Sequence, residues 1–517
     1  MKKTRFDQLI ILLVVVRLIF YLKDLIRWNF YLWGDNAIYA ILAKRFMVFD
    51  FWNAFHPYWN PGFPIATIPY YLLTHSWEAS QILVSITACI LLAVVTYWFL
   101  GKYSSLLGFL AAFVILFSAS FYKVVFYEGI SELLYILFMC LGIFHGWFAI
   151  SKNSLKSLLI ASVFFGLALL TRSDIMIVFA SYITLYVLLK RTKKSIVYAI
   201  LSVGAFAAIV SPYIYFQSRQ IGKFTISGKY AFYGTGPYYA LEKDRNTTMA
   251  QDVWAVDFVD YHSPYYDPSR AKSLMLKFLK NGTLYNNFKD GIVGGFRILA
   301  KNNSDNFFIV GSPFLSLIGL VVGTIDNKFR KFTLYLFVFW IASLVWVALF
   351  MQAYYRYLTY SLPYIVYLES LALYALWNFV KNKKGVKIAS LLLLLILCAI
   401  YFKNIDFQEK EKLVKRSDYH EQKTIGEYLK THEIYLFMGR REGMSLYSGA
   451  KLVYMPSSTP EEIIDYMKKW RVEYLVVDPN EVGYAYVAPI ADPRFNDKDL
   501  SLVKEFEDGI LLWKLNL

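Results

Sequence analysis

Asp35 is the first residue in the chain whose type and surroundings suit acid–base chemistry. It follows an apolar run long enough to cross a membrane and stands among aromatic residues in the stretch 33–40. A carboxylate at a membrane surface is costly unless it has a partner or a function. Tyr39 follows four residues later, on the same face of a helix. Asp35 also suits the start of a short helix, and capping is compatible with a role as general base.

Further polar residues occur beside later apolar runs. His56 and Asn60 belong to a stretch of turn formers and aromatic residues at 56–64, and Glu128 lies just before an apolar run that begins near residue 130. Arg172 and Arg356 stand at the ends of two other apolar runs. Such an arginine, taken alone, is typical of an interfacial anchor or of a partner for an acidic residue. The roles of the two arginines therefore depend on their neighbours.

The composition identifies the medium in which these residues act. Of the 517 residues, 57% are hydrophobic and only 18% are charged, whereas soluble domains have about 45–50% apolar and about 25% charged residues. The surplus apolar residues must face lipid, which excludes a soluble globular protein. The net charge of +16 is accounted for by lysines and arginines in short loops on one side of a membrane, so nucleic acid is excluded as a partner.

Apolar stretches recur through the first four-fifths of the chain, each long enough to cross a hydrocarbon core of about 30 Å as a helix. We expect about eleven transmembrane helices and hence a polytopic α-helical protein of the plasma membrane. Because Lys and Arg gather in alternate loops, we expect a cytoplasmic N-terminus and, with an odd number of spans, an extracytoplasmic C-terminus. The expected spans are 7–23, 78–100, 104–122, 130–150, 155–171, 174–189, 196–216, 307–323, 332–350, 358–380 and 386–402.

The segments between these spans predict a second domain. Two longer segments, 24–77 and 217–306, lie on the expected outer side, and an apolar stripe predicts a helix at 35–46. From about residue 405 the composition is that of a soluble domain, in which Thr459 opens a capping box before a helix that ends at Trp470. Strand-like runs lie at 434–438, 452–455, 474–477 and 510–515. We therefore expect a transmembrane catalytic domain at 1–404 and a small extracytoplasmic α/β domain at 405–517.

The predicted topology places the candidate residues at one interface. Asp35, His56, Glu128, Arg172 and Arg356 all project to the outer side. Guanidinium groups there suit a lipid-linked phosphate, and a carboxylate that faces them suits the removal of a proton from an attacking hydroxyl. This combination has the outline of a glycosyl-transfer site.

At these positions the chain resembles the GT-C superfamily of membrane glycosyltransferases, in the branch that includes protein O-mannosyltransferases and the lipid A aminoarabinose transferase. The resemblance covers about the first 400 residues and rests on Gly34-Asp35-Asn36-Ala37-Ile38-Tyr39, His56-Pro57, Asn60-Pro61-Gly62-Phe63-Pro64, Glu128, Leu169-Leu170-Thr171-Arg172, and Arg356-Tyr357 with Pro363. It implies that Asp35 is catalytic and that the donor is a polyprenyl- or dolichyl-monophosphate sugar. The family more often has Glu where this chain has Asn36. The absence of Trp-Trp-Asp from the C-terminal domain speaks against the oligosaccharyltransferase branch.

We therefore expect inverting transfer of one sugar from a polyprenyl-phosphate donor to a hydroxyl of a protein or lipid-linked glycan acceptor, within membrane lipids. Asp35 is the expected general base, and the expected phosphate-binding residues are Arg172 and Arg356. The residues expected to orient the sugar or the acceptor are Tyr39, His56, Asn60 and Glu128.

Two other functions remain compatible with the sequence. A transporter or lipid flippase is one, although such proteins usually carry ionisable residues at the bilayer midplane, where this chain has almost none. A polymerase or ligase of lipid-linked glycans is the other, and it would use a diphosphate-linked donor at the same face. No cofactor is firmly expected; His56 and Glu128 are the weak candidate ligands for a divalent metal.

Overall fold

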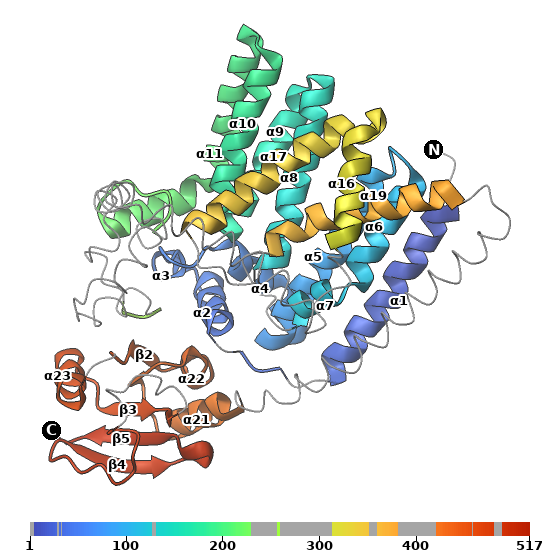
Figure 1. Cartoon of the computed structure of the whole chain (residues 1–517). Coiled ribbons are helices and arrows are strands. Elements are labelled where there is room, and N and C mark those ends of the chain that lie inside the picture. Colours follow the sequence, from blue (N-terminus) through green and yellow to red (C-terminus); the bar gives the residue numbers. More distant parts are fainter. Residues whose placement is uncertain are drawn as a thin grey trace. The chain divides into compact units, whose positions relative to one another are not determined.

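The computed structural model describes residues 5–27, 30–32, 34–126, 131–228, 256–258, 313–350, 359–380, 420–456, 459–479 and 489–516. The chain divides into two compact units, described here one at a time (Figure 1). The first contains residues 1–29, 69–212 and 278–414, and the second contains residues 30–68, 213–277 and 415–517. The segments expected to form the outer loops thus group largely with the C-terminal residues. The expected domain boundary near residue 404 lies outside the described residues.

The first unit is helical. Its described helices follow the predicted spans closely, because in a long apolar run the helix is the structure that satisfies the backbone in lipid. Three of the described helices are long and apolar enough to cross a membrane: α5, α8 and α11. The bounds are α1 Arg5–Arg27, α5 Trp77–Leu100, α6 Ser105–Phe117, α7 Ala119–Phe126, α8 Glu132–Lys152, α9 Leu155–Thr171, α10 Ile175–Lys190, α11 Lys193–Ile221, α16 Pro313–Ile325, α17 Asn327–Phe350, η2 Thr359–Ser361 and α19 Leu362–Val380. Helix α4, Gly62–Thr74, and the end of α11 cross the boundary between the units.

One predicted span is divided in the structure, and another lies outside the described residues. The stretch 104–122 is divided into α6 and α7 at Ser118, whose backbone is extended with φ −70° and ψ 131°. Ser118 therefore ends α6, and α7 begins at the next residue. The expected span at 386–402 lies outside the described residues.

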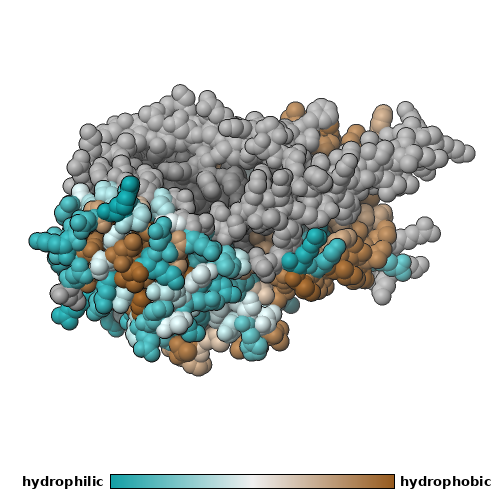
Figure 2. Space-filling model, turned by 90° about the horizontal axis from the view of Figure 1, so that it is seen from below, coloured by the Kyte–Doolittle hydropathy of each residue, from teal (hydrophilic) through white to brown (hydrophobic). Residues whose placement is uncertain are grey.

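Aromatic side chains and glycines set the packing of the first unit. Phe99 of α5 stacks on Phe144 of α8 with ring centroids 4.1 Å apart. A Cβ at Gly142 would lie 2.8 Å from the ring of Phe165, so glycine permits the close approach of α8 and α9. Large apolar side chains on α1 and α11 remain exposed, Ile26 by 85% and Ile200 by 65%. Such exposed surface suits lipid, and Figure 2 shows hydrophobic residues gathered on the described helices of this part of the chain.

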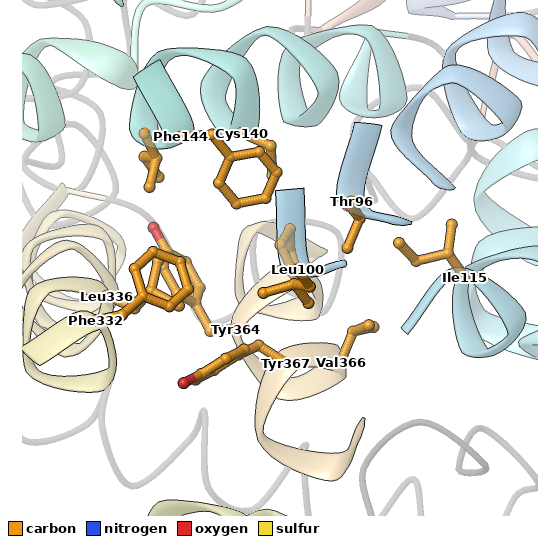
Figure 3. Close-up of a pocket in the computed structure, with 12 residues that line it drawn as sticks. Thr96, Leu100, Ile115, Cys140, Phe144, Phe332, Leu336, Tyr364, Val366 and Tyr367 are labelled. Carbon is orange, nitrogen blue, oxygen red and sulfur yellow. The ribbon is translucent and has the colours of Figure 1, made fainter. Parts of the chain in front are cut away.

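A small cavity lies among the helices α5, α6, α8, α17 and α19 of the first unit. Figure 3 shows Cys140 and Phe144 of α8 across it from Tyr364 and Tyr367 of α19. Its volume is about 20 Å³, which is enough for about one water molecule and too small for a sugar. The cavity is therefore a packing defect of the helix bundle rather than a substrate site.

The second unit contains a five-stranded mixed sheet in the order β2-β1-β3-β5-β4. The strands β1, β2 and β3 are parallel, whereas β5 runs antiparallel to both β3 and β4. Helices α21, α22 and α23 flank the sheet (Figure 1), and hydrophilic residues predominate on its surface (Figure 2). The bounds are α2 Asp35–Met47, α3 Phe51–Ala54, α21 His420–Thr431, β1 Leu436–Gly439, α22 Glu442–Ser448, β2 Lys451–Tyr454, α23 Pro460–Trp470, β3 Tyr474–Val477, β4 Leu500–Glu505, η5 Glu507–Gly509 and β5 Leu511–Leu515.

The local signals of this unit predicted its elements well. Thr459 and Glu462 form the expected capping box, and α23 ends at Trp470 as predicted. The four predicted strand runs correspond to β1, β2, β3 and β5. Strand β4 was not predicted, because it lies at the sheet edge with only Leu500 buried and therefore lacks an apolar run.

Candidate functional site

Asp35 occupies the first residue of α2, directly after a glycine that turns the chain. Gly34 has φ +50° and ψ −134°, a backbone conformation that only glycine adopts without strain. The carbonyl of Gly34 accepts the hydrogen bond from the backbone N–H of Ile38 and so begins the helix. A carboxylate in the first turn is favoured by the positive end of the helix dipole. The sequence thus directs Asp35 to a helix N-terminus, as the apolar stripe at 35–46 predicted.

Trp59 holds the carboxylate of Asp35. Its indole Nε1–H donates a hydrogen bond of 2.9 Å to Asp35 Oδ1. Trp59 is only 3% exposed, and its ring centroid lies 4.6 Å from that of His56 and 4.8 Å from that of Tyr58. The structure therefore brings two of the predicted residues, Asp35 and His56, into contact with one tryptophan. Sequence reasoning missed Trp59, although it stands in the same aromatic stretch as His56 and Asn60.

Tyr39 and Asn60 lie in the packed interior beside this group. Tyr39 is 3% exposed and meets the ring of Phe63 edge to face, with centroids 5.4 Å apart. Asn60 is 1% exposed at the entry to α4. Both residues belong to the same unit as Asp35. Because they are buried, only a small part of each side chain is accessible to a sugar or an acceptor.

Of the two ring nitrogens of His56, Nδ1 accepts a hydrogen bond, which leaves Nε2 as the donor. Its Nδ1 accepts a hydrogen bond of 3.0 Å from the backbone N–H of Tyr58. A neutral imidazole with an accepting Nδ1 carries its proton on Nε2, which then donates and does not ligate a metal. The other candidate metal ligand, Glu128, lies outside the described residues. Among the residues that the structure describes, no three His, Cys, Asp or Glu side chains are grouped to hold a metal ion.

Arg172 lies in a buried ionic cluster of the first unit. Its Nη1 donates to Glu132 Oε1 at 2.7 Å, and its Nε donates to Asp174 Oδ2 at 3.0 Å. The hydroxyl of Tyr360 donates to the same Asp174 oxygen at 2.7 Å, and the Tyr360 ring lies 5.2 Å from the guanidinium carbon. Glu132 begins α8, Arg172 ends α9, Asp174 precedes α10 and Tyr360 belongs to η2. The cluster therefore joins the ends of three helices to η2.

The charges of this cluster bear on the role expected for Arg172. One guanidinium faces two carboxylates, so the three side chains together carry one negative charge when ionised. An anionic phosphate is repelled by such a net charge unless another cation compensates. The geometry favours the interpretation of Arg172 as a partner for acidic residues. Arg356, the second expected phosphate ligand, lies outside the described residues.

Comparison with known proteins identifies the fold around these two clusters. Residues 61–216 match the profile of a family described as dolichyl-phosphate-mannose-protein mannosyltransferase. This match agrees with the resemblance of the chain to the GT-C membrane glycosyltransferases. The whole sequence finds no match among curated proteins.

Solved structures extend the likeness over nearly the whole chain. ArnT from Cupriavidus metallidurans, in a crystal structure bound to undecaprenyl phosphate, superposes with a TM-score of 0.60 at 14% identity, covering 98% of each chain. The oligosaccharyltransferase AglB from Archaeoglobus fulgidus, in complex with an inhibitory peptide and a dolichol-phosphate, has a TM-score of 0.54 at 13% identity, covering 92% of this chain and 70% of its own. At these identities the likeness shows the fold. The chain thus shares the fold of these membrane proteins, and three of its described helices are long and apolar enough to cross a membrane.

Proposed function

We propose that this GT-C enzyme transfers one sugar from a polyprenyl-monophosphate donor to an acceptor hydroxyl at the outer membrane face, with Asp35 as the general base. The observation that carries the proposal is the Asp35 carboxylate, placed at a helix N-terminus and held by Trp59 in a chain with the GT-C fold. A carboxylate fixed in one orientation is what proton removal from a bound hydroxyl requires. ArnT, which shares this fold, was crystallised bound to undecaprenyl phosphate, and this supports a donor of the same class here.

The proposed step is a single displacement. Asp35 takes the proton of the acceptor hydroxyl while that oxygen forms a bond to the anomeric carbon of the sugar. The bond between that carbon and the phosphate oxygen breaks, its electron pair stays with the phosphate, and the lipid leaves as polyprenyl phosphate. Attack from the face opposite the phosphate inverts the configuration at the anomeric carbon. No residue of the protein becomes covalently attached to the sugar.

The other candidate residues have supporting roles in this proposal. Arg356 neutralises the charge that develops on the phosphate, and Arg172 acts with it only if another cation compensates the two carboxylates of its cluster. Tyr39, His56, Asn60 and Glu128 orient the sugar or the acceptor. Buried Tyr39 and Asn60 do so by shaping the wall around Asp35, while His56 acts through its contact with Trp59. The proposed arrangement is a transmembrane domain at 1–404, with the domain at 405–517 outside the cell.

A donor panel tests the proposal. The purified protein, in lipid and supplemented with a membrane extract as a source of acceptors, receives one radiolabelled sugar in three forms: polyprenyl monophosphate, polyprenyl diphosphate and nucleotide-linked. The panel is then repeated with other sugars. We expect label to leave the lipid only from a monophosphate donor, with polyprenyl phosphate as the second product. Turnover of the diphosphate form instead would indicate a polymerase or ligase, and turnover of no donor by folded protein would contradict the proposal.

A further inference from the structure

The C-terminal part of the second unit forms hydrogen bonds near both ends of α2, the helix that begins with Asp35. The backbone N–H of Leu32, three residues before Asp35, donates a hydrogen bond of 3.1 Å to the hydroxyl of Tyr447 in α22. Near the other end of α2, Lys44 Nζ donates to the carbonyl of Leu446 at 3.1 Å. These contacts join residues more than 400 positions apart in the sequence. Two adjacent residues of α22 therefore contact the lead-in to α2 and a lysine of its last turn.

Gly443 shows how closely α22 approaches the lead-in to Asp35. A Cβ at this position would lie 2.8 Å from the carbonyl oxygen of Leu32 and would also meet the side-chain amide of Gln422. Glycine inside a helix costs about 1 kcal/mol relative to alanine. A glycine at this position is thus accounted for by the space that the Leu32 backbone occupies.

A second contact fixes the far end of α2 to the sheet. Arg45 forms an ion pair with Asp257, and it also donates to the carbonyls of Val256 at 2.9 Å and Asn53 at 3.1 Å. The other oxygen of Asp257 accepts a hydrogen bond of 3.1 Å from the backbone N–H of Leu452 in β2. Asp257 is therefore a bridge between α2 and the sheet. Seven of the thirteen residues of α2 are buried.

We propose that α22 positions the catalytic carboxylate, with Tyr447 as the positioning residue that sets the path of the chain into Gly34 and Asp35. The inference rests on the proposed role of Asp35 and assigns the C-terminal domain a part in the reaction. Tyr447 fixes Leu32, Leu32 leads through Gly34 into the first turn of α2, and that turn directs Asp35 toward Trp59. An error of about 1 Å in such a group costs on the order of 100-fold in rate.

The test compares Tyr447→Phe with the matched control Tyr435→Phe in full-length protein in lipid. The first change removes the hydroxyl that accepts from Leu32, whereas Tyr435 has a side chain exposed in the same domain. We expect kcat, counted per polyprenyl-phosphate binding site, to fall about fivefold to tenfold in Tyr447→Phe, from the loss of one hydrogen bond. The KM for the donor and the shape of the pH profile should stay unchanged. Gly443→Ala, which displaces Leu32, should lower kcat further.

A measurement that needs no turnover separates this inference from the proposed function. We expect hydrogen exchange of the first-turn amides of α2 to quicken in Tyr447→Phe and to match wild type in Tyr435→Phe. Unchanged exchange and unchanged kcat in Tyr447→Phe would overturn the inference while leaving the role of Asp35 intact. If wild type transfers no sugar but exchange still quickens, the proposed function fails and the structural coupling of α22 to α2 stands. A raised KM with unchanged kcat would also overturn the inference.

Discussion

Replacing Trp59 by phenylalanine removes the donor that holds Asp35 while retaining an aromatic ring in the same site. The bond lost is the 2.9 Å contact from indole Nε1 to Asp35 Oδ1. Hydrogen bonds to charged groups contribute about 1.5–3 kcal/mol. At about 1.36 kcal/mol for each factor of ten in rate, this corresponds to a fall of about 10-fold to 150-fold in kcat. Because Trp59 is nearly fully buried, water is poorly placed to substitute for the lost donor.

The assay for this variant is sugar transfer from a saturating polyprenyl-phosphate donor, with Trp52→Phe as the matched control. Trp52 stands in the same segment between α1 and α5 but has a side chain 49% exposed, so its replacement should change kcat by less than twofold. Equal elution and equal apparent unfolding temperatures would show that both variants are folded. A Trp59→Phe enzyme that turns over as fast as wild type would refute the view that Trp59 orients the base.

Three further predictions concern the rest of the chain. Glu132→Gln replaces the charged contact to Arg172 by a neutral one and leaves Asp174 to balance the guanidinium, so it should cost about 1.5–3 kcal/mol of stability, seen as a lower apparent unfolding temperature, whereas exposed Glu427→Gln should change nothing. Burial raises the pKa of Asp257 above its ordinary value of 3.8, although Arg45 opposes the shift. The free energy of unfolding of wild type, relative to that of Asp257→Asn, should therefore fall as pH rises from about 4 through the raised pKa and stay constant above it. Denaturant titrations in which this free-energy difference rises with pH would contradict the prediction. An impermeant maleimide added to intact cells should label Val48→Cys and spare Lys328→Cys, and the reverse pattern would invert the predicted topology.

The parts of the fold that the sequence predicted are those set by local chemistry. The helix start at Asp35 follows from the glycine before it and the apolar stripe after it, and the start of α23 follows from the Thr459 capping box. The apolar spans were predictable because a helix in lipid satisfies its own backbone hydrogen bonds. Edge strand β4 was missed because an exposed strand needs no apolar pattern, and the break at Ser118 was missed because both flanking runs are apolar.

The contacts that organise the two candidate clusters are long-range, and no local pattern encodes them. Trp59 reaches Asp35 across 24 positions, Arg172 reaches Glu132 across 40, and Tyr360 reaches Asp174 across 186. The sequence supplied the residue types, from which a partner for Arg172 was one open interpretation. The choice between that interpretation and a phosphate ligand needed the positions of Glu132 and Asp174. The contact of Tyr447 with the lead-in to Asp35 likewise could not be predicted, because it joins residues at opposite ends of the chain.

The most direct test of the central claim is the rate of sugar transfer by Asp35→Asn beside Asp50→Asn in the same membranes. Both changes remove one negative charge from the segment between α1 and α5 and keep the side-chain shape. Asp50 caps the short helix α3, a role that asparagine also fills, so its variant is a matched control. We predict that Asp35→Asn binds the polyprenyl-phosphate donor but transfers no measurable sugar, while Asp50→Asn transfers at the wild-type rate. Transfer by Asp35→Asn at the rate of Asp50→Asn would show that another group removes the proton and would contradict the account.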